Sequence, residues 1–176
     1  ANTSAMSATT IDGGTGADVL SSVGGYANVV TYKDMDSLTL SANADGSTTT
    51  VTGTSATAVT LGAYAQTLAS SSSALTTVTA YATGTLALSG TGAFTVTGQT
   101  SGAITSTGSG ALTITAGAAI TTVTSSAATT IAAGTMSTQV MTLAGTGAFT
   151  VTGYDSSGAI TKTGTGALAV TATATA

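Results

Sequence analysis

Apolar and polar residues alternate along this chain in short runs that end at serine, aspartate or glycine. Early runs are Tyr26–Tyr32 (YANVVTY), Asp36–Ser41 (DSLTLS) and Ser47–Thr52 (STTTVT). Period-two alternation is typical of strands that bury one face, and no apolar stripe of 3.6-residue period competes with it. The turn residues Asn43–Gly46 (NADG) predict a hairpin between the second and third runs. The fold class is therefore predicted to be all-β.

An internal repeat occupies the second part of the chain. Leu88–Gly98 (LSGTGAFTVTG) matches Leu143–Gly153 (LAGTGAFTVTG) at an offset of 55 residues, and Ser101–Leu112 matches Ser157–Leu168 at an offset of 56. A shorter unit, Gly-x-Gly-Ala-φ-Thr-φ-Thr with φ an apolar residue, starts at Gly90, Gly108, Gly145 and Gly164, and the last copy has Ala169 in place of its first Thr. Strand, turn, strand and turn thus close in about 18 residues, which predicts a two-faced β-solenoid.

Residue types agree with this architecture. Thr, Val and Ile favour strands, small Gly and Ala permit tight corners, and the absence of Pro suits central strands that cannot lose hydrogen-bond donors. A β-sandwich with short hairpins is the alternative. Five of the six aspartates and one of the two lysines fall within residues 1–50. We therefore expect a small N-terminal β module over 1–50 and a repetitive stack of about seven coils over 51–176.

Composition excludes several classes of function. The 176 residues include no Cys, His, Trp, Pro, Glu or Arg, and only 5% are charged, against about 25% in ordinary soluble domains. Two lysines cannot neutralise a nucleic-acid backbone, so nucleic acid is not an expected partner. Without His or Glu, the usual acid–base catalysts are missing, and no enzyme activity is expected. Asp34 and Asp36 beside Lys33 are more typical of a solvated edge than of an active site.

Two features bear on location. No run of about 18 apolar residues exists, so no transmembrane segment is predicted. The chain opens on Ala1-Asn-Thr-Ser4, as a mature protein does after a leader is removed, although a piece of a longer protein would look the same. We expect a secreted protein that is extracellular or held at the cell surface.

The segment Gly13–Leu20 (GGTGADVL) fits the GGxGxDxU motif of calcium-binding β-rolls. In that motif glycines turn the chain, backbone carbonyls face the ion, and Asp supplies the hard oxygen that calcium prefers. The candidate metal ligands are Asp12, Gly14, Gly16 and Asp18, with calcium as the candidate cofactor. Only one copy is present, so the alternative is a glycine-rich turn that leads into a strand.

With this motif the chain resembles the RTX-type surface-layer proteins and related large secreted proteins of Gram-negative bacteria. The resemblance rests on Ile11–Leu20 and on the following segment Asp34–Ala42 (DMDSLTLSA), and elsewhere on Thr/Ala/Gly/Val composition and strand rhythm. It implies type I secretion, calcium-dependent lattice assembly and a structural role. The chain departs from the family because it is short and has no tandem RTX block.

Thr-x-Thr triplets form a second candidate site. They are Thr95/Thr97, Thr105/Thr107, Thr113/Thr115, Thr122/Thr124, Thr150/Thr152 and Thr161/Thr163. Period two puts both threonines of a triplet on one face and its middle residue on the other. Stacked coils would then carry ladders of hydroxyls and methyls, as ice-binding solenoids do. The alternative is a neutral wet surface, because Ser106 and Lys162 replace the apolar middle residue.

The last strand, Ala167–Ala176 (ALAVTATATA), has none of the charges or prolines that usually guard a sheet edge. We therefore predict a self-assembling surface-layer or filament subunit whose main partner is itself. The predicted assembly interface contains Leu168, Val170, Thr171, Thr173 and Thr175. An ice-binding module and an adhesin stalk fragment are the alternatives. Cell-surface polysaccharide is a further candidate partner, with Tyr26, Tyr32, Tyr64, Tyr81 and Tyr154 as candidate contacts.

Overall fold

The computed structural model describes residues 7–21, 29–40, 47–62, 66–80, 85–98, 101–115, 119–133, 140–155 and 159–173. Within these ranges every regular element is a β-strand. The strands form two sheets of nine strands each, and neighbouring strands are parallel throughout. The prediction of an all-β, two-faced solenoid is confirmed. A sandwich of short hairpins is excluded for this part of the chain, because hairpins require antiparallel neighbours.

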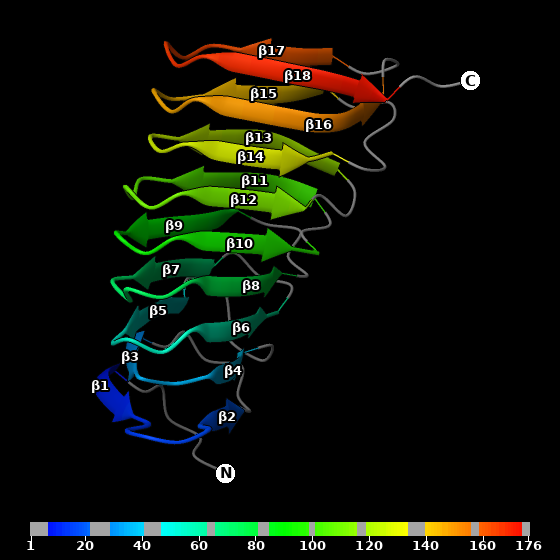
Figure 1. Cartoon of the computed structure of the whole chain (residues 1–176). Coiled ribbons are helices and arrows are strands. Elements are labelled where there is room, and N and C mark those ends of the chain that lie inside the picture. Colours follow the sequence, from blue (N-terminus) through cyan, green and yellow to red (C-terminus); the bar gives the residue numbers. More distant parts are fainter. Residues whose placement is uncertain are drawn as a thin grey trace.

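The chain crosses from one sheet to the other at every strand, so one strand of each sheet makes a coil (Figure 1). Sheet A contains β1 (Ser7–Asp12), β3 (Val29–Lys33), β5 (Ser47–Thr52), β7 (Gln66–Ser70), β9 (Leu86–Gly90), β11 (Ser101–Ser106), β13 (Ala119–Ser125), β15 (Val140–Ala144) and β17 (Ala159–Lys162). Sheet B contains β2 (Val19–Ser21), β4 (Ser37–Leu40), β6 (Thr57–Leu61), β8 (Thr76–Ala80), β10 (Phe94–Thr97), β12 (Leu112–Thr115), β14 (Thr129–Ala132), β16 (Phe149–Asp155) and β18 (Leu168–Thr173). A coil takes roughly 19 residues.

The core lies between the sheets and is built from stacked columns of like residues. In sheet B one inward column runs through Leu38, Val59, Val78, Val96, Ile114, Ile131 and Val151, all of them buried. In sheet A a facing column runs through Leu86, Ile104, Val123 and Leu143, also buried. Each such side chain contributes about 1.5–3 kcal/mol on burial. Val96 and Ile114 therefore point inward, as their triplets predict.

Two of the corners that lead from sheet A to sheet B, those at Gly90 and Gly145, require glycine for two reasons. Gly145 has φ of +103°, a region that side chains rarely adopt. A Cβ at Gly145 would also lie 2.2 Å from the carbonyl oxygen of Ser125 in the preceding coil. Gly90 repeats both features, with φ of +99° and a Cβ 2.0 Å from the carbonyl oxygen of Ser70. The first glycine of the repeat unit thus permits close stacking of the coils.

Strand pairing continues through the compositional boundary near Val51. Tyr32 in β3 pairs with Val51 in β5, which in turn pairs with Ser70 in β7. The change in composition between residues 1–50 and 51–176 therefore does not coincide with a break in either sheet.

The hairpin prediction is wrong. The strands on either side of the expected turn, β4 and β5, belong to different sheets, and β5 pairs with β3 and β7 instead. Residues 41–46, which contain the expected turn, lie outside the described ranges. The reason is physical, since turn residues favour a local reversal of the chain but do not determine which sheet the next strand joins.

Candidate functional site

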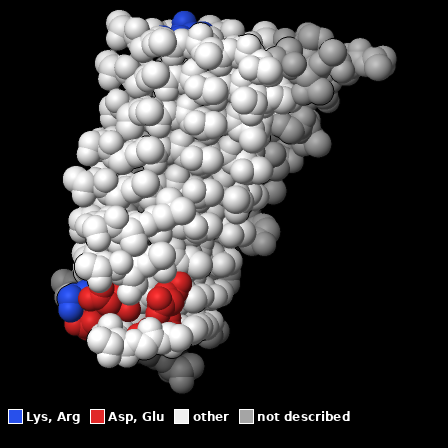
Figure 2. Space-filling view, in the orientation of Figure 1, with Lys and Arg blue, Asp and Glu red and all other residues white. Residues whose placement is uncertain are grey.

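Charged side chains gather at the N-terminal end of the stack. The face seen in Figure 2 has acidic atoms and one basic group over the first coils, no charged atoms along the coils beyond them, and a second basic group at the opposite end. The described charges at the N-terminal end are Asp12, Asp18, Lys33, Asp34 and Asp36. They belong to the first two turns from sheet A to sheet B and the strand residues beside them, because β1 ends at Asp12 and β3 ends at Lys33.

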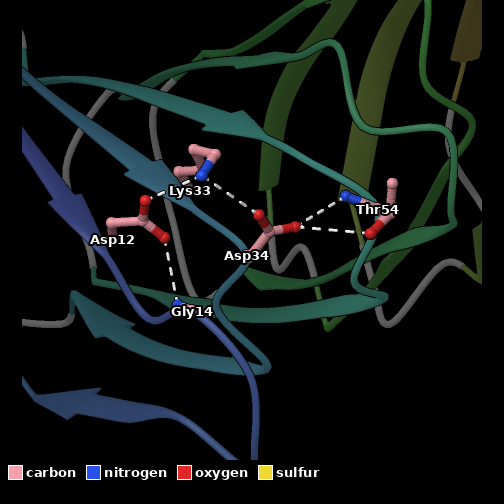
Figure 3. A network of polar contacts seen from close by, with 5 residues as sticks. All are labelled: Asp12, Gly14, Lys33, Asp34 and Thr54. Carbon is pink, nitrogen blue, oxygen red and sulfur yellow. Dashed lines mark hydrogen bonds and ion pairs between the residues drawn. The ribbon is translucent and has the colours of Figure 1, made fainter.

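Asp12 is held by the next coil. Its carboxylate accepts a hydrogen bond from Lys33 Nζ at 2.7 Å and another from the Gly14 backbone N–H at 3.0 Å (Figure 3). Asp12 and Lys33 are register partners in β1 and β3, which is why the contact forms. The hydrogen bond from Lys33 is the main cause that lowers the pKa of Asp12, and the same bond raises the pKa of Lys33.

Asp34 extends the same network to the third coil. Its φ of +49° is left-handed, a conformation that Asp tolerates better than most residues. In this position Asp34 Oδ1 accepts the Thr54 N–H at 2.8 Å, and its Oδ2 lies 3.5 Å from Lys33 Nζ (Figure 3). The Thr54 N–H is the main cause that lowers the pKa of Asp34. Asp12, Lys33, Asp34 and Thr54 thus link three successive coils.

Asp36 makes a separate contact. Its Oδ2 accepts the Asp18 N–H at 2.9 Å, while the Asp18 carbonyl accepts the N–H groups of Asp36 and Ser37, each at 3.1 Å. Asp34 and Asp36 both lie in the turn between β3 and β4, and they bind different backbone groups. Within the described residues, Asp18 Oδ2 is buried without a hydrogen-bond partner.

One of the predicted calcium ligands, Asp12, already binds other groups of the chain. The carboxylate of Asp12 is occupied by Lys33 and Gly14, so a cation there would have to displace the lysine. Gly14 and Gly16 have positive φ, as the motif's turn requires. Among the described residues no group of three or more Asp, Glu, His or Cys side chains could hold a metal ion. As the side chains lie, this segment has the geometry of a polar turn, and calcium binding stays a prediction.

The outer face of sheet B carries two columns of threonine. One column runs through Thr77, Thr95, Thr113, Thr130 and Thr150, and the other through Thr39, Thr60, Thr79, Thr97, Thr115, Ala132, Thr152 and Thr171. Both positions are threonine in β8, β10, β12 and β16. In the second column the hydroxyl groups of Thr79 and Thr97 lie 3.4 Å apart. These two columns therefore form a neutral strip of sheet B with a regular hydroxyl and methyl pattern.

Sheet A shows a weaker version of the same pattern. One outward column runs through Thr48, Thr67, Ala87, Thr105, Thr124 and Ala144, so alanine interrupts it twice. Threonine is thus the general surface residue of both sheets, and only sheet B places it in pairs on three adjacent coils.

The last coil leaves core residues uncovered. Leu168 and Val170 are 36% and 45% exposed, although their register partners Phe149 and Val151 are buried. Strand β18 pairs with β16, and within the described residues nothing covers its other edge. Of the predicted interface, Leu168 and Val170 lie in inward columns, Thr171 is exposed on the outer face, Thr173 ends β18, and Thr175 lies outside the described residues.

Lys162 stands at an inward position of the same coil. It pairs with Leu143 and so continues the buried column of Leu86, Ile104, Val123 and Leu143. The side chain is half-buried, and its ammonium donates a hydrogen bond to the Gly164 carbonyl in the next turn. The triplet Thr161-Lys162-Thr163 already indicated an inward lysine, but the sequence did not show that this lysine lies in the last described coil.

Two of the five tyrosines fall within the described core. Tyr32 and Tyr154 are buried, and burial raises the pKa of Tyr32. Neither can serve as a surface contact for polysaccharide, because both occupy inward positions. Tyr26, Tyr64 and Tyr81 lie outside the described residues.

Comparison with protein-family models, with curated proteins and with solved structures finds no match. Among the described residues there is no helix long and apolar enough to cross a membrane. What the protein does must therefore be inferred from its own surfaces, which are an open coil end, a charged coil end and a threonine face.

Proposed function

We propose that this protein is an extracellular structural subunit that associates through the edges of its terminal coils to build a surface layer or filament. The observation that carries the proposal is the edge strand β18, where Leu168 and Val170 are partly exposed in columns that are buried in the preceding coil. Proteins that stay monomeric usually protect such an edge with charge, proline or a bulge. The resemblance to RTX-type surface-layer proteins supports the extracellular location.

The free energy available at one junction is moderate. Completing the burial of Leu168 and Val170 contributes about 1 kcal/mol each. Each new backbone hydrogen bond contributes about 0.5–1.5 kcal/mol, and the open coil offers the six residues of β18 and the four of β17. The sum is comparable with the roughly 4–15 kcal/mol that association costs in lost freedom. Association should therefore be reversible and depend on concentration.

Two further properties support open-ended growth. With a net charge of −4 over 176 residues, the subunits repel one another weakly. A contact between the last coil of one subunit and the first coil of another is heterologous, and heterologous contacts that do not close into a ring give filaments or sheets.

Sedimentation velocity over a range of concentrations tests this proposal. The wild-type chain should form polymers, and Val170→Asp should remain monomeric because it places a charge in an inward column at the edge. Thr130→Asp is the matched control, since it adds the same charge to the outer face of β14, away from the ends. Wild-type protein that stays monomeric at every concentration would overturn the proposal. Repetition with calcium and with chelator tests the calcium dependence that the resemblance implies.

Ice binding is the second candidate, and the paired threonines of β8, β10 and β12 favour it. A bulky residue on the ladder, Thr95→Tyr, should abolish thermal hysteresis in this case. Thr105→Tyr, on the less regular face of sheet A, should preserve it. If the chain is monomeric and its thermal hysteresis responds to the two substitutions in this way, ice binding replaces assembly as the proposed function.

A further inference from the structure

Lys162 is the one described lysine in an inward column, and it lies in the last coil. In each earlier coil of that column back to Leu86 the residue is apolar and buried. The aliphatic stem of a lysine can cover apolar neighbours while its ammonium reaches a polar group, here the Gly164 carbonyl. A further coil stacked on this end would enclose the ammonium, and an enclosed charge requires a partner of opposite sign.

Such partners exist at the other end of the molecule, at the equivalent corner. Gly164 begins the turn between β17 and β18, and Asp12 and Asp18 flank the turn between β1 and β2. Both turns lead from sheet A to sheet B, so stacking the first coil of a second copy on the last coil brings the two turns to the same corner of the stack. The side chain of Asp12 is 49% exposed but already binds Lys33, whereas Asp18 Oδ2 is buried and has no hydrogen-bond partner among the described residues. Figure 2 shows the acidic groups and the distal basic group at opposite ends of the stack.

We infer that Lys162 determines the polarity of the junction by pairing with the Asp12–Asp18 turn of a second copy of this chain. The last coil of one copy thus accepts the first coil of the next, head to tail. Two last coils facing each other would bring two Lys162 ammonium groups together, and two first coils would bring two acidic turns together. Either arrangement leaves like charges opposed, whereas head-to-tail stacking pairs them. This inference rests on the proposed assembly.

The direct test is zero-length carbodiimide cross-linking of polymers grown from a mixture of normal and 15N-labelled full-length chains. We expect a peptide in which Lys162 of one isotope is joined to Asp12 or Asp18 of the other. Polymers without this cross-link would overturn the inference and leave the proposed function standing. A chain that forms no polymer at all would overturn both.

Lys162→Gln and Thr142→Glu form a matched pair, because each lowers the net charge by one. Thr142 lies on the outer face of β15 and is not part of the last coil. Lys162→Gln should raise the concentration needed for polymerisation about tenfold or more, and Thr142→Glu should change it less than about twofold. Circular dichroism establishes that each variant is folded. Equal effects of the two folded variants would show that only net charge matters and would contradict the inference.

Discussion

Three glycines allow the cost of close coil stacking to be separated from the cost of an unusual backbone conformation. Gly14 has φ of +80°, and a Cβ there would meet no described atom within 4 Å. Gly147 has no positive φ, but its Cβ would lie 2.0 Å from the Ala127 carbonyl oxygen in the preceding coil. Gly145 combines both features. Alanine at each position therefore tests the conformation alone, the stacking alone, or both.

The expected losses of unfolding free energy follow from these distances. Gly14→Ala should lose about 1–2 kcal/mol, the cost of a left-handed residue with a side chain. Gly147→Ala forces two backbones apart, and comparable overpacking costs about 1–3 kcal/mol or more. Gly145→Ala should lose about the sum of the other two, because its Cβ would both strain a left-handed backbone and collide with the Ser125 carbonyl oxygen.

Urea unfolding followed by circular dichroism measures these losses for the three variants and the wild type. The slope of each transition shows whether the variant exposes the same surface area on unfolding as the wild type. If Gly147→Ala were no more destabilising than an outward substitution such as Thr130→Ala, the coils could not be stacked as closely as the carbonyl distances require. That result would refute the corner geometry on which the solenoid depends.

Three other predictions concern the core and the charged end. Ile131→Ala, at a fully buried position, should lose about 2–5 kcal/mol of unfolding free energy, whereas Thr130→Ala should stay within about 0.5 kcal/mol; urea unfolding measures both. The lowered pKa values of Asp12 and Asp34 give stability that is present above the ordinary value of 3.8 and is lost as the pH falls through the lower folded-state values. Urea titrations at pH 6 and pH 3 should show a smaller difference for Asp12→Asn/Asp34→Asn than for the wild type. Tyr32 should ionise above the ordinary pKa of 10.0 because it is buried, and the ultraviolet titration of Tyr32→Phe should lack that late component.

Sequence patterns predicted the features of this fold that repeat locally. The inward positions of Val96 and Ile114 follow from period two, and the glycine corners follow from the spacing of Gly90 and Gly145. The hairpin between β4 and β5 was predicted wrongly, because Asp-Gly chemistry reports a turn and not the pairing of the strands around it. The compositional boundary near Val51 reports a change of surface charge, which strand pairing does not follow.

The contacts of the charged end depend on register between coils. Asp12 and Lys33 are 21 residues apart, which is close to the length of one coil. Had the pairing register of β1 and β3 been known, it would have placed the two residues side by side. Without that register the GGxGxD motif indicated a calcium site or a glycine-rich turn, and it gave no sign of the ion pair. The position of Lys162 at the end of a buried column can likewise be recognised only from the pairing of the whole stack. The triplet Thr161-Lys162-Thr163 differs from the other triplets in its middle residue only.

Negative-stain electron microscopy of the wild-type chain above its polymerisation concentration tests the central claim most directly. Association through the terminal coils predicts unbranched filaments, or sheets of laterally joined filaments, whose width is that of one solenoid. Val170→Asp prepared in the same way should give separate particles. Dispersed particles in the wild-type sample, or polymers that are unchanged by Val170→Asp, would contradict assembly through the open coil ends.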